Sequence, residues 1–296
     1  MRILTALLAC LLLILPCAAA GETVVTSFYP IYLIALNLFD GVEGIDVHNL
    51  AAPDFGCLHD YQLTVRDMKA LSSADVFLIN GADMEEFIEP ALESLPELEQ
   101  RIVDASPGVF LIEEDEEGET PYNPHIWLSV RNMQTMTANL AEGLAAMLPA
   151  HAEAIRANRD AYLERLRLLD AEITEQAIPL KGFAIVTFHE AFPYFADAYG
   201  IEIAAVMAHE PGDSLSAGEL MELVKLERSL GNPPLFTEPQ YSDSTAITVS
   251  QETGAPVYQL DPCVTGPANP PLDYYETVMR RNLTVLLEAF ESAGQA

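Results

Sequence analysis

The sequence predicts two doubly wound α/β lobes with mainly parallel sheets, joined by one long rigid helix. Three observations lead to this fold class. Half of the 296 residues are hydrophobic and 20% are charged, which is enough apolar material for two buried cores. Short apolar runs alternate with helical patterns, as expected for parallel sheets covered on both faces. A long helical tract divides these runs into two sets.

The first 20 residues are predicted to be a secretory signal peptide that is cleaved after Ala20. Arg2 supplies a positive charge, and an apolar run follows from Ala6 to Leu15. A lipoprotein signal ending at Cys10 or Cys17 is the alternative. We favour simple cleavage because Cys10 follows only nine residues and Cys17 follows a proline. The mature chain is therefore expected in the periplasm.

Residues 21–150 are assigned to the N-terminal lobe and residues 179–296 to the C-terminal lobe. Each lobe contains four short apolar runs that are separated by helical patterns, and we predict a strand at each. The predicted strands are residues 23–28, 46–50, 75–80 and 109–112, followed by 183–188, 201–207, 234–238 and 256–260.

Residues 151–178 are predicted to form the connecting helix. Pro149 precedes this tract and Pro179 closes it. At 1.5 Å per residue, such a helix spans about 40 Å, so it should act as a rod that disfavours large lobe closure. Its apolar residues recur at spacings of 7, 4, 3 and 4 and mark one buried face: Ile155, Tyr162, Leu166, Leu169 and Ile173.

Acidic residues far outnumber basic ones in this chain. The 45 Asp and Glu residues against 14 Lys and Arg give a formal net charge of −31. This balance excludes a general nucleic-acid binder, which needs a basic surface to neutralise phosphates. Glu113–Glu119 holds six acidic residues in seven. We interpret it as a solvated loop, with weak cation attraction near a metal site as the alternative.

Three histidines and an aspartate are the candidate chemical groups: His59, His125, His189 and Asp261. At least three of these four residues lie at or after the ends of predicted strands. Each lobe contributes two of the four. Ligands of doubly wound sheets bind beyond the carboxyl ends of the strands, so these residues would meet in the cleft between the lobes. Imidazole nitrogens with one carboxylate suit zinc. Spacing alone leaves open that they are unrelated polar loop residues.

Seven separated segments carry a resemblance to a known family: Thr26–Tyr32, His59–Thr64, Asn80–Glu85, Asn123–Leu128, His189–Phe195, Glu238–Tyr241 and Leu260–Pro262. In this order they resemble the periplasmic solute-binding proteins of ABC importers for zinc and manganese, and in particular the ZnuA-like zinc branch. The similarity runs from about residue 23 to 290. Members of that family have two α/β lobes joined by a rigid helix.

The resemblance implies that His59, His125, His189 and Asp261 bind the metal. Manganese-preferring members have a glutamate at the third position, so His189 favours Zn²⁺, with Mn²⁺ as the alternative. Two features depart from the family pattern. Glu113–Glu119 stands where zinc members often carry a His-rich loop, and Cys57-Leu58 replaces the usual Asp-Pro pair.

We therefore interpret the protein as a monomeric, high-affinity periplasmic metal-capture protein that delivers zinc to the permease of an ABC importer. On this interpretation it binds no nucleic acid and is not an enzyme. A secreted zinc hydrolase is the rival, for which only Asp60 and Glu190 offer a general base. An adhesin-type or manganese-binding member of the same fold is the other alternative.

Cys57 and Cys263 are the cysteines that remain after signal removal. Each lies two residues from a candidate ligand, so both should come near the metal site. In an oxidising compartment we favour a disulfide between them. Two free thiols and thiolate ligation of the metal are the alternatives.

Overall fold

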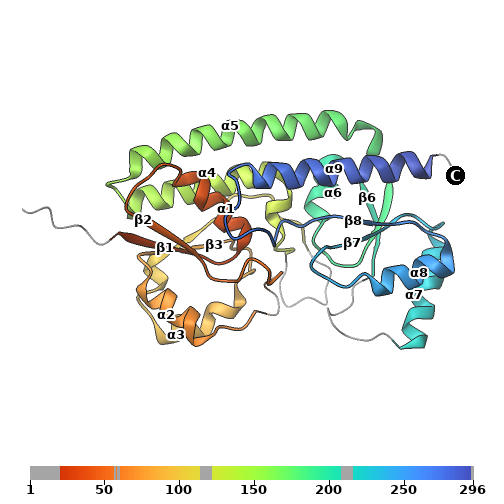
Figure 1. Ribbon diagram of the computed structural model, residues 1–296, viewed down its shortest axis with the longest axis horizontal. Coiled ribbons are helices and arrows are strands. Elements are labelled where there is room, and N and C mark those ends of the chain that lie inside the picture. Colours follow the sequence, from red (N-terminus) through yellow and green to blue (C-terminus); the bar gives the residue numbers. More distant parts are fainter. Residues whose placement is uncertain (1–20, 57, 59–60, 114–121, 208–215, 295–296) are drawn as a thin grey trace, which may run out of the picture.

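The computed structural model describes residues 21–56, 58, 61–113, 122–207 and 216–294. Two lobes lie side by side beneath the long helix α5 (Ala152–Gln176), and each is built on a four-stranded parallel sheet (Figure 1). The predicted fold class is confirmed. Within the described ranges, no helix is long and apolar enough to cross a membrane.

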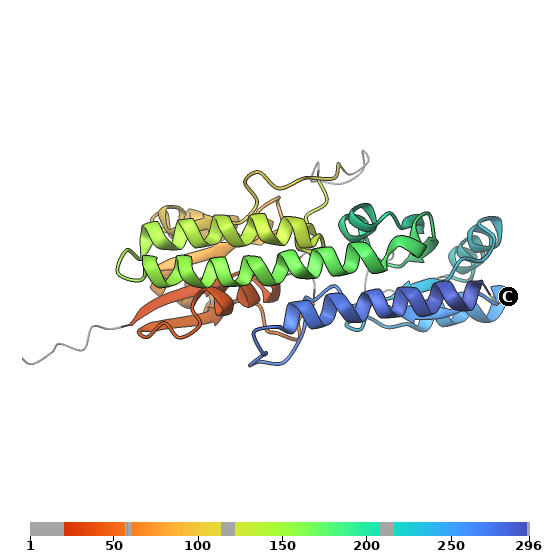
Figure 2. The same ribbon diagram turned by 90° about the horizontal axis from the view of Figure 1, so that it is seen from above.

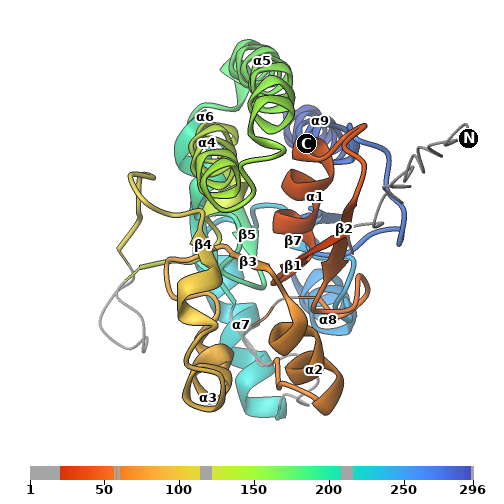
Figure 3. The same ribbon diagram turned by 90° about the vertical axis from the view of Figure 1, so that its left-hand side faces the viewer.

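The N-terminal sheet has the strand order β2-β1-β3-β4. Side chains alternate between its two faces: Val24 packs toward α1 and α4, whereas Val25 packs toward α2 and α3. Both faces are therefore buried, with helices above and below the strands (Figure 3). The elements are β1 (Glu22–Thr26), α1 (Tyr29–Leu38), β2 (Ile45–Asn49), α2 (Val65–Ser73), β3 (Val76–Ile79), α3 (Glu89–Ser94), β4 (Ile102–Asp104) and α4 (Val130–Met147).

One strand prediction in this lobe is wrong. The fourth strand is β4 (Ile102–Asp104), not residues 109–112. β4 ends at once because the Asp104 side chain accepts a hydrogen bond from the Ser106 N–H (2.7 Å) and turns the chain. Residues 109–112 then run beyond the sheet edge, and their apolar side chains, except exposed Phe110, pack on the core from outside.

The C-terminal sheet repeats the arrangement, with the order β6-β5-β7-β8. Ile185 and Phe236 face the core that α6 and α9 share with the N-terminal lobe, whereas Val186 and Leu235 face α7 and α8. The elements are β5 (Ala184–Thr187), α6 (Pro193–Tyr199), β6 (Glu202–Val206), α7 (Ala217–Ser229), β7 (Leu235–Thr237), α8 (Ser244–Thr253), β8 (Val257–Gln259) and α9 (Tyr274–Ala293).

The connecting helix α5 is continuous, as predicted, and buries all five residues of the predicted apolar face. It packs along α4 and also contacts α1 and α9; α4 lies beside one half of α5, and α9 lies beside the other half (Figure 2). Because α5 is supported by helices of both lobes, it is a fixed part of the core rather than an isolated linker.

A second connection between the lobes follows β8. After Asp261 the chain returns to the N-terminal lobe before it forms α9. There the Tyr29 hydroxyl donates to the Pro267 carbonyl (3.0 Å), and the Gly266 N–H donates to the Pro53 carbonyl (2.9 Å). A Cβ atom at Gly266 would lie 2.2 Å from the Tyr29 hydroxyl, so this close approach requires glycine.

Shortening a leucine side chain on the buried face of α5 should destabilise the protein far more than shortening one on its exposed face. Leu169 is completely buried, whereas its neighbour Leu168 is 52% exposed. We expect Leu169→Ala to lower the free energy of unfolding by about 2–5 kcal/mol, because it leaves a cavity in the core. Leu168→Ala should change it by less than about 0.5 kcal/mol. Guanidinium unfolding measures both, and equal effects would contradict this placement of α5.

Candidate metal centre

The candidate residues of the C-terminal lobe follow neighbouring strands. His189, Glu238 and Asp261 come just after β5, β7 and β8, which are adjacent in the sheet. His125 comes from the N-terminal lobe, before the 3₁₀ turn η4 (Ile126–Leu128) that leads into α4. The three positions in the C-terminal lobe agree with the rule that ligands bind at the carboxyl ends of parallel strands, whereas His125 lies in the long connection between β4 and α4.

The structure brings His125 and His189 together across the two lobes. Their ring centroids are 4.9 Å apart, with an interplanar angle of 84°. His125 is 1% exposed, whereas the side chain of His189 is 21% exposed. One imidazole therefore lies in the protein interior, and the other lies between the interior and solvent.

The orientation of His125 is fixed by Asn123. The Asn123 amide Nδ2 donates to the Glu190 carbonyl (2.8 Å), so its Oδ1 is the acceptor that faces His125 Nδ1 (3.1 Å). Nδ1 must then carry the proton, and Nε2 carries the lone pair that can bind a metal ion. The Tyr194 hydroxyl also donates to the Asn123 carbonyl (2.6 Å), which ties this loop to α6.

Asp261 is held by backbone and side-chain hydrogen bonds. Its N–H donates to Asn282 Oδ1 (2.9 Å), and Asn282 Nδ2 donates to its carbonyl (2.7 Å). Its carboxylate accepts from the Cys263 N–H (2.8 Å). Burial raises the pKa of Asp261, while the Cys263 hydrogen bond acts in the opposite direction. A nearby cation would stabilise the ionised form of this carboxyl group.

Trp127 connects the His125 segment to the Asp261 segment. Its indole Nε1–H donates to the Pro262 carbonyl (2.7 Å), and its own carbonyl accepts from the Tyr275 hydroxyl (2.7 Å). The indole is fully buried, 5.2 Å from the His125 ring between centroids. Buried hydrogen bonds therefore hold the two lobes in register at this point.

A buried carboxylate supports the loop beneath His125. Glu85 accepts from the N–H groups of Asn80 (2.7 Å) and Gly81 (3.0 Å), and burial raises its pKa to about 7. Asn80 Nδ2 in turn donates to the carbonyl of Pro124, next to His125 (3.0 Å). Gly81 has φ +73°, and a Cβ atom there would lie 2.0 Å from Asp104. The segment Asn80–Glu85 thus acts as a scaffold for the loop that carries His125.

Several predictions concern residues outside the described ranges: the signal peptide of residues 1–20, Cys57, His59, Asp60 and most of Glu113–Glu119. Beside His59, Leu58 is buried and its carbonyl accepts from the Tyr61 N–H (2.8 Å). In the described part of the chain, no three His, Cys, Asp or Glu residues are arranged to hold a metal ion. His125, His189 and Asp261 therefore do not form a complete site by themselves.

Cys263 is buried and forms no disulfide with any residue that the structure describes, and burial raises the pKa of its thiol well above the ordinary value. A raised pKa disfavours the thiolate form that binds metals. The disulfide with Cys57 stays a prediction.

Glu238 is a site residue that the sequence argument missed. Its carboxylate Oε1 lies 3.0 Å from His189 Nδ1, and its side chain is 4% exposed. It is the last residue of a predicted strand, as the other candidates are at or near strand ends. The same position rule could have identified it.

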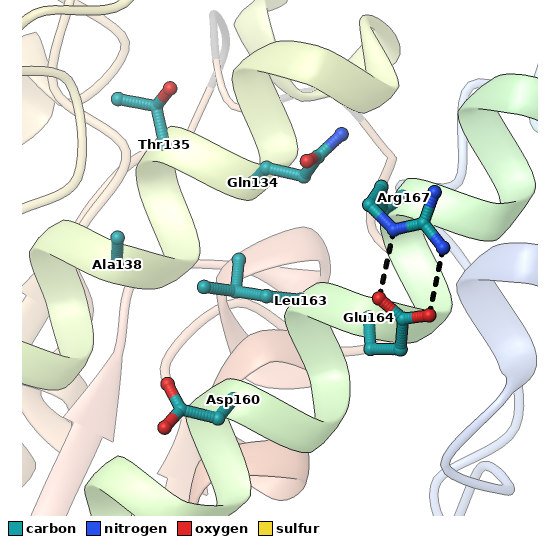
Figure 4. Close-up of a pocket in the computed structure, with 7 residues that line it drawn as sticks. All are labelled: Gln134, Thr135, Ala138, Asp160, Leu163, Glu164 and Arg167. Carbon is teal, nitrogen blue, oxygen red and sulfur yellow. Dashed lines mark hydrogen bonds and ion pairs between the residues drawn. The ribbon is translucent and has the colours of Figure 1, made fainter.

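An open groove of about 490 Å³ lies between α4 and α5 (Figure 4). Its charged residues include Arg167, which forms an ion pair with Glu164 (2.8 Å). None of its seven lining residues is a histidine or cysteine, and none belongs to the candidate metal centre. We assign no chemistry to this groove.

Comparisons with known proteins identify relatives that are described as metal-binding proteins. The iron-binding protein YfeA of Yersinia pestis is 32% identical over 241 residues, which are 78% of this chain and 74% of YfeA. The zinc-binding lipoprotein AdcA of Streptococcus pneumoniae is 26% identical over 305 residues, covering 97% of this chain. That match covers only 60% of AdcA, so this chain spans little more than half the length of that relative.

Solved structures have the same fold. The solute-binding protein FpvC of Pseudomonas aeruginosa, in complex with Mn²⁺, superposes with a TM-score of 0.79 at 26% identity, over 92% of this chain and 99% of FpvC. Zn(II)-bound AdcA of S. pneumoniae gives a TM-score of 0.78 at 25% identity, over 92% of this chain and 58% of AdcA.

The family profile described as zinc-uptake complex component A, periplasmic, matches residues 24–289. This match includes both sheets, the connecting helix and every candidate ligand. The chain therefore belongs to the ZnuA family of periplasmic zinc-uptake components.

Proposed function

We propose that this protein captures a divalent transition metal in the periplasm, with zinc preferred, and delivers it to the permease of an ABC importer. The observation that carries the proposal is the pair His125 and His189, which come from different lobes with ring centroids 4.9 Å apart. Each ring has a hydrogen-bond acceptor at Nδ1, which directs metal binding to Nε2. His59 and Asp261 complete the proposed set of four ligands.

Zinc is preferred because three imidazoles and one carboxylate form a nitrogen-rich set, whereas manganese and magnesium favour oxygen ligands. The relatives named above are described with iron, zinc and manganese, so competition is the appropriate test. Metal-free protein dialysed against equal amounts of Zn²⁺, Mn²⁺ and Fe²⁺ should retain one Zn²⁺ per chain. Preferential retention of Mn²⁺ or Fe²⁺ would contradict the preference, and no retained metal would contradict the function.

We assign the protein no catalytic step. A zinc hydrolase needs a carboxylate aimed at metal-bound water. Of the two general-base candidates, Asp60 lies outside the described residues, and Glu190 has an exposed side chain and a carbonyl that accepts from Asn123. Glu238 and Asp261 are both accounted for by binding or orienting roles. The relatives reported above are described as metal-binding or solute-binding proteins, which supports capture over hydrolysis.

The cellular part of the proposal has direct tests. Cleavage after Ala20 predicts a mature protein that begins at Gly21, which the mass of the periplasmic protein would establish. A disulfide between Cys57 and Cys263 predicts no free thiol after denaturation without reductant, and two free thiols would exclude it. The monomeric state and the permease partner are testable by light scattering and by reconstitution of metal uptake.

Metal affinity should fall as the pH drops through about 6.5. The ligands bind zinc as neutral imidazoles and an ionised carboxylate, so protons compete with the metal. Burial raises the pKa of Asp261, so this group takes up a proton at a higher pH than an ordinary aspartate and adds to the same trend. Chelator competition between about pH 8 and about pH 5 measures the effect. An affinity that does not change with pH would exclude the histidines as ligands.

A further inference from the structure

We propose that Glu238 is a positioning residue of the metal centre, which orients His189 for metal binding, balances the charge of the bound dication and strengthens the preference for zinc. This inference rests on the proposed function. Glu238 would do so without binding the metal itself.

The first step is the contact with His189. A carboxylate can only accept a hydrogen bond, so the 3.0 Å contact between Glu238 Oε1 and His189 Nδ1 requires the proton on Nδ1. Nε2, on the opposite side of the ring, then carries the lone pair for the metal. A hydrogen bond of this kind fixes both the tautomer and the ring orientation of a metal-binding histidine.

The second step is that Glu238 is itself held in place. Its other oxygen, Oε2, accepts a hydrogen bond from Gln240 Nε2. Gln240 lies against the N-terminal lobe, since a Cβ atom at Gly56 would be 3.5 Å from Gln240 Cγ. Both carboxylate oxygens therefore have partners, and the side chain cannot turn away from His189 without losing a buried hydrogen bond.

The third step concerns charge. A dication bound by neutral histidines and one aspartate leaves a net charge of about +1 in a buried site, which is costly. Glu238 and Asp261 follow the adjacent strands β7 and β8, so both carboxylates lie at the same edge of the C-terminal sheet. Together the two carboxylates bring the charge of the occupied centre to about zero.

The last step is specificity. The orienting partner of His125 is the neutral amide of Asn123, whereas the partner of His189 is an anion. A carboxylate partner makes an imidazole a stronger donor than an amide partner does. Zn²⁺ gains more than Mn²⁺ from a stronger nitrogen donor, because Mn²⁺ is the weaker acceptor in the Irving–Williams order. The Glu238–His189 pair is therefore expected to increase the ratio of zinc affinity to manganese affinity.

Two variants separate orientation from charge. Glu238→Ala removes the acceptor and the charge, whereas Glu238→Gln removes the charge but keeps an acceptor oxygen at the same position. Glu288→Gln is the matched control, since Glu288 is an exposed glutamate on α9. Dissociation constants for Zn²⁺ and Mn²⁺ are measured for the full mature chain by chelator competition. The ¹⁵N chemical shifts of the His189 ring report its tautomer in the metal-free protein.

We expect Glu238→Ala to weaken Zn²⁺ binding by about 10–100-fold, and Glu238→Gln to weaken it by about 10-fold or less, with the control unchanged. The ratio of Zn²⁺ to Mn²⁺ affinity should fall in both variants. The His189 ring should be the Nδ1–H tautomer in the wild type and in Glu238→Gln, and a mixture in Glu238→Ala. A merely structural role would lower thermal stability without moving the tautomer or the metal preference.

The results that overturn the inference are distinct from those that overturn the function. Suppose that the wild-type protein binds zinc and that Glu238→Ala keeps the same metal affinity, metal preference and His189 tautomer. This result would overturn the role of Glu238 but not the proposed function. A wild-type protein that binds no metal would overturn the proposed function and this inference with it. If Glu238→Ala does not fold, the test is the ratio of Zn²⁺ affinity to Mn²⁺ affinity in Glu238→Gln. A ratio equal to that of the wild type would overturn the role of Glu238.

Discussion

Replacing His125 or His189 with alanine is expected to weaken Zn²⁺ binding by about a hundredfold or more. Four-ligand zinc sites release about 10–16 kcal/mol on binding, so loss of one ligand should cost on the order of 3 kcal/mol. Asp261→Ala and His59→Ala should have effects of the same order if all four residues bind one ion. Chelator competition on the purified, metal-free variants gives the dissociation constants.

The matched control for these variants is His48→Ala. His48 is exposed on the edge strand β2 and hydrogen-bonds Asp46 (2.9 Å). Circular dichroism would show that each variant keeps its fold. Trp127, the only tryptophan, lies 5.2 Å from His125 between ring centroids and offers a second readout by fluorescence. Unchanged affinity in any one ligand variant would remove that residue from the proposed set.

Zinc should raise the melting temperature of the metal-free protein by about 8–16 °C when it is present at about 1,000 times its dissociation constant. Binding to the folded state alone contributes about 4 kcal/mol at that excess. For a chain of this size, each kcal/mol corresponds to roughly 2–4 °C. The shift should grow with the logarithm of the free zinc concentration, as differential scanning calorimetry would show.

Mg²⁺ at the same concentration should leave the melting temperature almost unchanged, because it favours oxygen ligands. His189→Ala should melt near the wild-type metal-free temperature and respond little to zinc. A zinc-induced shift that is equally large in His189→Ala would show that the metal stabilises the protein from another site.

The elements that local patterns control were predictable from the sequence. The apolar residues of α5 recur with the helical period, and all five are buried in the structure. Seven of the eight strands lie where apolar runs predict them, within one or two residues. The exception is β4 (Ile102–Asp104), where only Ile102 and Val103 are apolar and the charged residues Arg101 and Asp104 flank them, so no apolar run marks the strand. The more apolar residues 109–112 gave the stronger signal although they lie outside the sheet.

Interactions between distant segments could not be predicted in this way. The return of the chain to the N-terminal lobe depends on a close contact between Tyr29 and Gly266, which no local period reveals. The hydrogen bonds that orient the candidate ligands also join residues that are far apart in the sequence. Glu238 lies 49 residues beyond His189 in the sequence, and Trp127 binds a carbonyl 135 residues away. Strand ends indicated where ligands could gather, but which acceptor orients each imidazole required the structure.

X-ray absorption at the zinc edge of the loaded protein tests the central claim most directly. We predict one Zn²⁺ bound by three imidazole nitrogens and one carboxylate oxygen at about 2.0–2.2 Å, with tetrahedral geometry. The imidazole contribution should decrease in His125→Ala and in His189→Ala. A sulfur ligand at about 2.3 Å, or a shell of oxygen atoms alone, would contradict a centre built on His59, His125, His189 and Asp261.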